Sequence, residues 1–75
     1  KLDKILKTAF VSVDRMDKFV ILRTLPGNAS ALANLIDKRY AKELFGTLND
    51  DDNVLMITRT EADTENLFKD FQRYV

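Results

Sequence analysis

Leu44–Thr58 reads LFGTLNDDDNVLMIT and predicts a β-hairpin. Two runs rich in apolar and β-branched residues, Leu44–Leu48 and Val54–Thr58, lie on either side of the polar cluster Asn49–Asn53. Asn and Asp favour turns because their side chains can hydrogen-bond to the nearby backbone. We therefore expect the two runs to pair as antiparallel strands, with the rest of the chain packed around them.

The turn of this hairpin, Asn49–Asn53, is called the acidic turn below, because it contains three successive aspartates, Asp50, Asp51 and Asp52. Their charges repel one another, and no residue within the turn neutralises them. A solvated surface turn is one interpretation. A site for a guanidinium or ammonium group is the second, since carboxylates on a rigid hairpin suit such cations. A calcium loop is the third, although the alternating aspartates and the distal glutamate of such loops are missing.

Composition argues against enzymatic chemistry. The 75 residues suffice for one small domain, residues 1–75, and contain neither Cys nor His. Thiol nucleophiles, zinc thiolates and His-containing triads are therefore excluded. The serines Ser12 and Ser30 do not lie in a Gly-x-Ser-x-Gly motif. We expect no catalytic residue, no cofactor and no metal site.

Charge and hydropathy limit the partners. Twelve basic residues balance twelve acidic ones, so the domain is not expected to bind nucleic acid strongly by itself. No apolar run approaches the roughly 18 residues of a membrane span, and no signal peptide is visible. These features predict a cytoplasmic protein without a membrane partner. Because the chain begins at Lys1 rather than Met, we expect a fragment of a longer protein.

The N-terminal half predicts a second hairpin. Residues 1–7 place Leu2, Ile5 and Leu6 at helical spacing, which is expected for the end of a linker from a missing N-terminal DNA-binding domain. From Thr8 the period changes to two, with Ala9, Val11 and Val13 on one face of a strand. Residues 14–17 predict the turn, and residues 18–24 the returning strand.

Two helices complete the predicted fold. Pro26 and Gly27 end the second strand, and Asn28 is a favourable N-cap for a helix that runs to about Lys38. Thr60 caps the last helix, with Asp63 at the capping-box position. The order β-β-α-β-β-α predicts an α+β fold with two layers, in which two helices cover one face of a four-stranded antiparallel sheet.

The second face of that sheet needs a cover. Residues 19–22 and 54–57 are apolar on both faces, whereas a sheet with one wet face alternates apolar and polar side chains. Another subunit is the simplest cover, although a misread register or an absent domain would also explain the pattern. The predicted oligomer interface comprises Phe19, Val20, Ile21, Leu22, Val54, Leu55, Met56 and Ile57.

Asp37 is an unusual residue in the last turn of the first predicted helix, because the helix dipole disfavours an anion there. Lys38 and Arg39 could simply compensate its charge. A role in binding a cation is the other explanation, and the sequence leaves both open.

Two motifs resemble a known family. Leu22–Ala29 reads LRTLPGNA and precedes a helix rich in small residues that ends in Leu35–Asp37. The second motif, Phe45–Leu55, has the form FGTL-x-x-DD-x-VL. Together, in this order and at this separation, they resemble the C-terminal domain of the bacterial arginine repressor, and the resemblance extends from about Ala9 onward.

This resemblance implies a function. In that family the C-terminal domain senses L-arginine and assembles the repressor into hexamers built from two trimers. An N-terminal winged helix-turn-helix domain, absent here, binds operator DNA. The effector lies between the trimers, and an aspartate pair receives its guanidinium or amino groups. The matching residues of this chain are Asp51 and Asp52, the helix residue Asp37, and Asn28, Ala29 and Ser30 at the helix start.

The chain departs from the family pattern at two positions. Asp50 stands where the family usually has Gly before the aspartate pair, and Ser30 where many members carry Gln or His. A positive φ at residue 50 would strain an Asp, and the short Ser30 side chain would lose a direct ligand contact or need a bridging water. The alternative function is therefore a purely structural oligomerisation module that has lost arginine binding.

Overall fold

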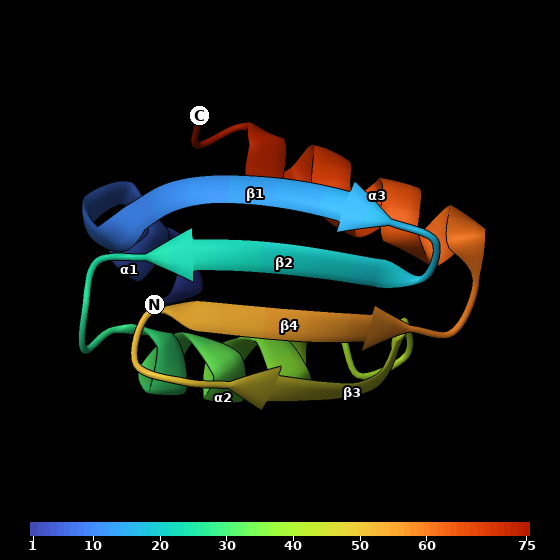
Figure 1. Cartoon of the computed structure of the whole chain (residues 1–75), viewed down its shortest axis with the longest axis horizontal. Helices are drawn as coiled ribbons and strands as arrows, with labels where there is room; N and C mark the ends of the chain where they lie inside the picture. Colours follow the sequence, from blue (N-terminus) through green and yellow to red (C-terminus); the bar gives the residue numbers. More distant parts are fainter.

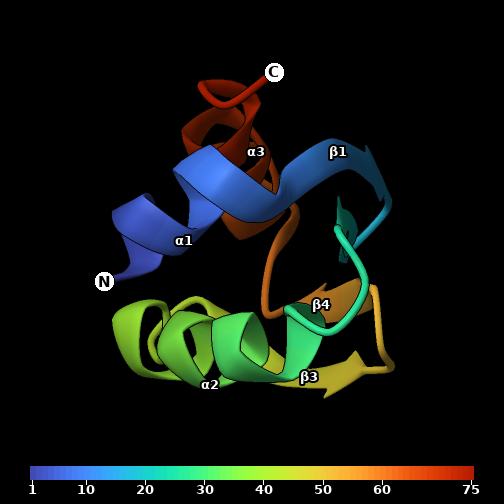
Figure 2. The same ribbon diagram turned by 90° about the vertical axis from the view of Figure 1, so that its left-hand side faces the viewer.

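Three helices cover one face of a four-stranded antiparallel sheet in the computed structural model, which describes residues 1–75 (Figures 1 and 2). The strand order across the sheet is β1-β2-β4-β3. The predicted α+β architecture is confirmed, with one additional helix at the N-terminus. The elements in chain order are α1 (Leu2–Ala9), β1 (Phe10–Met16), β2 (Phe19–Thr24), α2 (Ala29–Arg39), β3 (Leu44–Asn49), β4 (Asn53–Thr58) and α3 (Glu61–Gln72).

The predicted hairpin at Leu44–Thr58 is confirmed. β3 pairs with β4, with Leu48 opposite Leu55 and Asn49 opposite Val54. β4 also pairs with β2, so the two most apolar strands occupy the centre of the sheet. Their alternate side chains are buried beneath the helices, as expected for strands whose two faces meet different surroundings.

The first hairpin differs from the prediction in the position of its turn and in which side chains of β1 point toward the core. β1 continues to Met16, and Asp17 makes the turn with φ 52°, a left-handed conformation that Asp tolerates better than most residues. A bulge between Phe10 and Ser12 shifts the pairing with β2. Ala9 is buried and Val13 packs against the core, as predicted, but Phe10 packs there in place of Val11, which is exposed, because the bulge inserts one extra residue into the alternation.

The core lies between the sheet and the helices. Val20, Leu22, Val54 and Met56 are fully buried on the covered face of the two central strands. The helices contribute the other large members of the core, which are Leu6, Leu32, Ile36, Leu67 and Phe71. None of the helices has the length and apolar character needed to cross a membrane.

The segment expected to be the end of a linker is a helix of the domain. Leu6 and Ala9 of α1 are each only 2% exposed, and Leu6 belongs to the core. The Tyr74 hydroxyl donates to the Asp3 carboxylate, and the Phe10 and Tyr74 rings lie 6.1 Å apart. The start of the chain is thus fixed to its C-terminal end through polar and apolar contacts.

Leu6→Ala is expected to destabilise the domain by about 2–5 kcal/mol, because it removes buried methyl groups and leaves a cavity. Urea unfolding followed by circular dichroism measures the change. Lys4→Ala, a substitution of an exposed residue in the same helix, is the matched control and should stay within about 0.5 kcal/mol. Equal unfolding midpoints for the two variants would mean that α1 behaves as a detached linker.

Candidate functional site

The acidic turn docks against the loop between β2 and α2. The backbone N–H of Thr24 donates to the Asp52 carbonyl at 2.8 Å, and the N–H of Gly27 donates to the Asp51 carbonyl at 3.0 Å. Gly27 has φ +86°, which a residue with a side chain would adopt only with strain. Figure 2, which views this end of the sheet, places the turn and the loop beside the start of α2. The fold therefore brings the two predicted site motifs together.

The three carboxylates of the turn have different surroundings. Asp50 Oδ1 accepts the backbone N–H groups of Asp52 at 3.1 Å and Asn53 at 2.8 Å. Asp52 Oδ1 accepts the Asn53 side-chain amide at 2.9 Å. The Asp51 side chain is exposed and makes no hydrogen bond, and the chain's two ion pairs, Lys7–Asp3 and Arg15–Glu65, lie elsewhere. No ion pair joins the acidic turn to a basic side chain of this chain, although Arg23, opposite Asn53 in the sheet, lines the same hollow as Asp50.

Asp50 fits the turn without backbone strain. Asp17 is the one residue other than glycine that has a positive φ, so the strain considered for Asp50 is absent. The backbone N–H of Asp52, with the amides of Asn53, holds the pKa of the Asp50 carboxyl below its usual range. Asp50 thus acts locally as the acceptor that closes the turn, which the Asp-x-x-Asn spacing could have indicated.

The start of α2 differs from the prediction in its capping. The Asn28 side-chain amide donates to the Leu25 and Pro26 carbonyls, each at 3.2 Å, and makes no cap bond to the helix. Ala29 is fully buried, so it exposes no atom to a ligand in the isolated chain, whereas Ser30 is exposed. The first turn of α2 contains no acidic residue, so its free N–H groups present the positive end of the helix beside the acidic turn.

Asp37 lies apart from this cluster. It is eight residues beyond Ala29 in α2, about 12 Å along the helix axis. Its Oδ1 accepts the hydroxyl of Thr47 on β3 at 2.8 Å, and it forms no ion pair with Lys38 or Arg39. Compensation by a direct ion pair is therefore excluded, and one chain alone does not bring Asp37 together with Asp51 and Asp52. The structure contains no cluster of metal-ligating side chains.

The uncovered face of the sheet is apolar. Of the eight residues predicted for an interface, Val20, Leu22, Val54 and Met56 have no accessible side chain, because the chain's own helices cover them. Phe19, Ile21, Leu55 and Ile57 remain on the uncovered face, called the open face below. The structure adds Leu48, 64% exposed opposite Leu55, and Met16, 67% exposed opposite Phe19.

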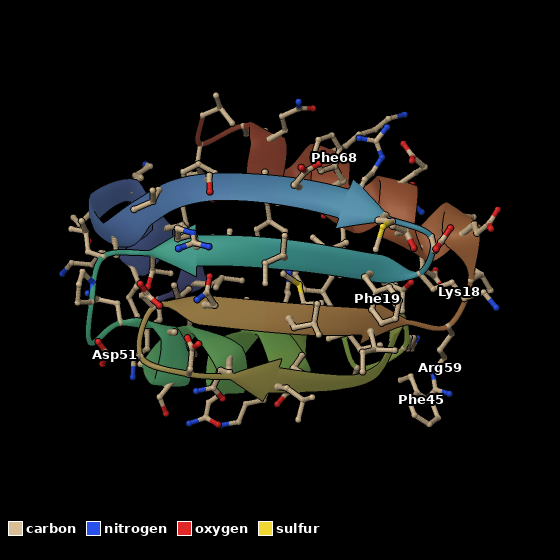
Figure 3. All side chains as sticks on the ribbon, viewed as in Figure 1. Lys18, Phe19, Phe45, Asp51, Arg59 and Phe68 are labelled. Atoms are coloured by element: carbon tan, nitrogen blue, oxygen red, sulfur yellow. The ribbon has the colours of Figure 1, made fainter.

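Two hollows mark the open face. Each has a volume of about 450 Å³, and Ile21 and Leu55 line both of them. The more apolar hollow includes Phe19 and Met16, and the more polar one reaches Asp50. In Figure 3, Phe19 and Asp51 lie at opposite ends of the sheet, so the acidic turn is at one end of this face.

Comparison with known proteins identifies relatives of the chain. The model of the family described as "Arginine repressor, C-terminal domain" matches residues 6–73. The arginine repressor of Lactiplantibacillus plantarum is 48% identical over 73 residues, which are 97% of this chain and 48% of that protein. The arginine repressor of Bacillus subtilis is 42% identical over 67 residues, which are 89% of this chain and 45% of that protein.

The chain spans about half the length of these curated relatives. The matched region includes both site motifs, α2 and all four strands. The family is one of repressors rather than enzymes, in agreement with the expectation from composition. The chain belongs to the family of arginine repressor C-terminal domains.

Proposed function

We propose that this domain senses L-arginine and assembles the regulator that contains it into trimers and hexamers. The acidic turn carries the proposal: three carboxylates lie beside the open end of α2, and none of them forms an ion pair within the chain. A guanidinium has five donors in a planar fork and can bind a carboxylate through two parallel hydrogen bonds. Asp51 and Asp52 are the acceptors in this proposal.

The other end of the ligand carries an α-carboxylate. The uncapped N–H groups at the start of α2, with the exposed hydroxyl of Ser30, can attract that anion. Positive and negative groups thus lie near one another at one end of the sheet, as a zwitterionic amino acid with a cationic side chain requires. In this proposal Asp37 reaches a ligand only from a neighbouring subunit, because it lies at the far end of α2 and is bonded to Thr47.

Self-association completes the proposal. Ile21, Leu55 and Leu48 form a row across three strands of the open face, and water covers this row in the isolated chain. Apolar patches of this kind mark contact surfaces between proteins. A second copy of the chain offers the same apolar surface, so the open face is the proposed subunit contact.

The longer protein is proposed to be a cytoplasmic regulator of transcription in arginine metabolism. Its operator-binding part lies outside residues 1–75 in this proposal, since the relatives are about twice as long. The balanced charge of the domain agrees with that division, because a domain that binds many phosphates is clearly basic.

Thermal unfolding with and without L-arginine tests arginine sensing. A ligand that binds only the native state stabilises it by RT ln(1 + [L]/Kd), about 2.7 kcal/mol at 100 times Kd. For a domain of this size we expect a rise in Tm of about 10 °C or more. L-Citrulline, in which an uncharged ureido group replaces the guanidinium, is the matched control and should raise the Tm much less. Equal Tm values with and without saturating arginine would favour the purely structural oligomerisation module.

A further inference from the structure

Asp50 and Asn53 form a hydrogen-bonded frame inside the acidic turn. The Asp50 carboxylate accepts the backbone N–H groups of both Asp52 and Asn53, at 3.1 and 2.8 Å. Although Asp50 is exposed to solvent, one of its oxygens is directed at the backbone of the turn. Its surroundings are those of a residue that shapes the loop.

Asn53 extends the frame to the neighbouring carboxylate. Its Nδ2 group lies 3.2 Å from Asp50 Oδ1 and 2.9 Å from Asp52 Oδ1, so one amide bridges two carboxylates. The orientation of the amide follows from this chemistry, since the reverse orientation would direct its oxygen at two anions. The cost is visible at Asn53 Oδ1, which is buried without a hydrogen-bond partner. We infer that the hydrogen bonds from Asn53 Nδ2 to Asp50 and Asp52 offset the free-energy cost of this unpaired oxygen because they hold the geometry of the turn.

We propose that Asp50 and Asn53 are positioning residues, which fix the Asp52 carboxylate and leave Asp51 free to receive the ligand. This inference rests on the proposed arginine site. The three successive aspartates then have distinct roles: Asp50 closes the turn, Asp52 is a preoriented acceptor, and Asp51 is an unrestrained acceptor at the surface. Preorientation raises affinity because less conformational freedom is lost on binding.

Two variants of Asp50 separate this role from direct ligand contact. Asp50→Asn keeps an oxygen that can accept both backbone N–H groups but removes the charge. Asp50→Ala removes the oxygen and the charge. If Asp50 is a positioning residue, arginine affinity is retained in Asp50→Asn and reduced in Asp50→Ala, whereas a residue that binds the guanidinium directly loses affinity in both variants.

Calorimetry of L-arginine binding is the test. Asp50→Asn should bind within about 3-fold of the original chain, and Asp50→Ala and Asn53→Ala should each bind about 10-fold more weakly, as expected for one lost charge-assisted hydrogen bond. Asp63→Asn and Asp63→Ala, in the first turn of α3, are the matched controls and should leave affinity unchanged. Deuterium exchange provides the second readout: the amides of Asp52 and Asn53 should exchange faster in Asp50→Ala than in Asp50→Asn.

Each outcome decides the inference. Equal losses for Asp50→Asn and Asp50→Ala would make Asp50 a direct contact, and unchanged affinity in Asp50→Ala would leave it without a role. Either result overturns the positioning role while the arginine site stands. If Asp50→Ala fails to fold, Asn53→Ala decides alone, and unchanged affinity in that variant overturns the inference. Absence of binding by the original chain would overturn the proposed function and, with it, this inference.

Discussion

Ile21→Asp is expected to convert the chain from an oligomer into a folded monomer. Ile21 lies on the open face, opposite Leu55 of β4, and is only partly covered within one chain. In a subunit contact its carboxylate would be buried without a partner, which costs about 3–5 kcal/mol. Association should therefore weaken by more than roughly 100-fold. Sedimentation velocity at tens of micromolar protein measures the change.

Two further variants serve as controls for this prediction. Val75→Asp makes the same chemical change at a residue that is 86% exposed and lies after α3, so the oligomer should persist. Val20→Asp places the charge one residue away but inside the core, so the domain should unfold. An original chain that sediments as a monomer, or an Ile21→Asp variant that remains an oligomer, would contradict the assignment of the open face.

Asp51→Asn and Asp52→Asn are expected to weaken L-arginine binding by about 10- to 150-fold. Each substitution keeps the size of the side chain and removes a charged acceptor, and a hydrogen bond to a charged group contributes about 1.5–3 kcal/mol. L-Lysine should bind more weakly than L-arginine to the original chain, since an ammonium group cannot make the forked contact. Isothermal calorimetry of the chain and the two variants measures both effects.

The Asp63→Asn variant is the control for loss of one negative charge far from the acidic turn, and its affinity should be unchanged. If Asp51→Asn and Asp52→Asn both retained the original affinity, the acidic turn would be ordinary solvated surface. That outcome would favour the first interpretation of the three successive aspartates, a solvated surface turn without a ligand.

The features that the sequence predicted well are local. The β3–β4 hairpin follows from two apolar runs around a polar turn, and the start of α3 follows from Thr60, whose hydroxyl accepts the Asp63 N–H at 3.0 Å. Both depend on residues a few positions apart. The apolar centres of β2 and β4 also predicted correctly that the sheet has two apolar faces, because a strand with one wet face alternates.

The features that the sequence did not predict depend on tertiary packing. The bulge at Phe10–Ser12 directs Phe10 rather than Val11 toward the core, and a period of two cannot reveal one inserted residue. Helical spacing in residues 1–7 does not show that α1 packs on the domain, because only its contacts with Tyr74 and the core reveal a docked helix. The three successive aspartates made the turn a candidate site, but the sequence did not indicate that this turn docks on Thr24 and Gly27.

Asn28 and Asp37 illustrate the same limit within the site. Asn is a favourable N-cap, but the carbonyls of Leu25 and Pro26 compete successfully for its side chain. Asp37 has a partner on a strand ten residues further along the chain, and helical spacing contains no information about it. These hydrogen bonds of Asn28 and Asp37 depend on distances that are set when the helices pack on the sheet, so the sequence alone does not reveal them.

If the proposed ligand lies between subunits, it contacts more than one chain, and arginine binding and assembly are then linked. Sedimentation equilibrium of the chain over a range of L-arginine concentrations measures this linkage. We expect the mean mass to double from that of a trimer to that of a hexamer as arginine saturates the protein, and the apparent affinity to rise with protein concentration. Saturable arginine binding with no change in mass at any protein concentration would place the ligand within a single chain or trimer and would contradict this linkage.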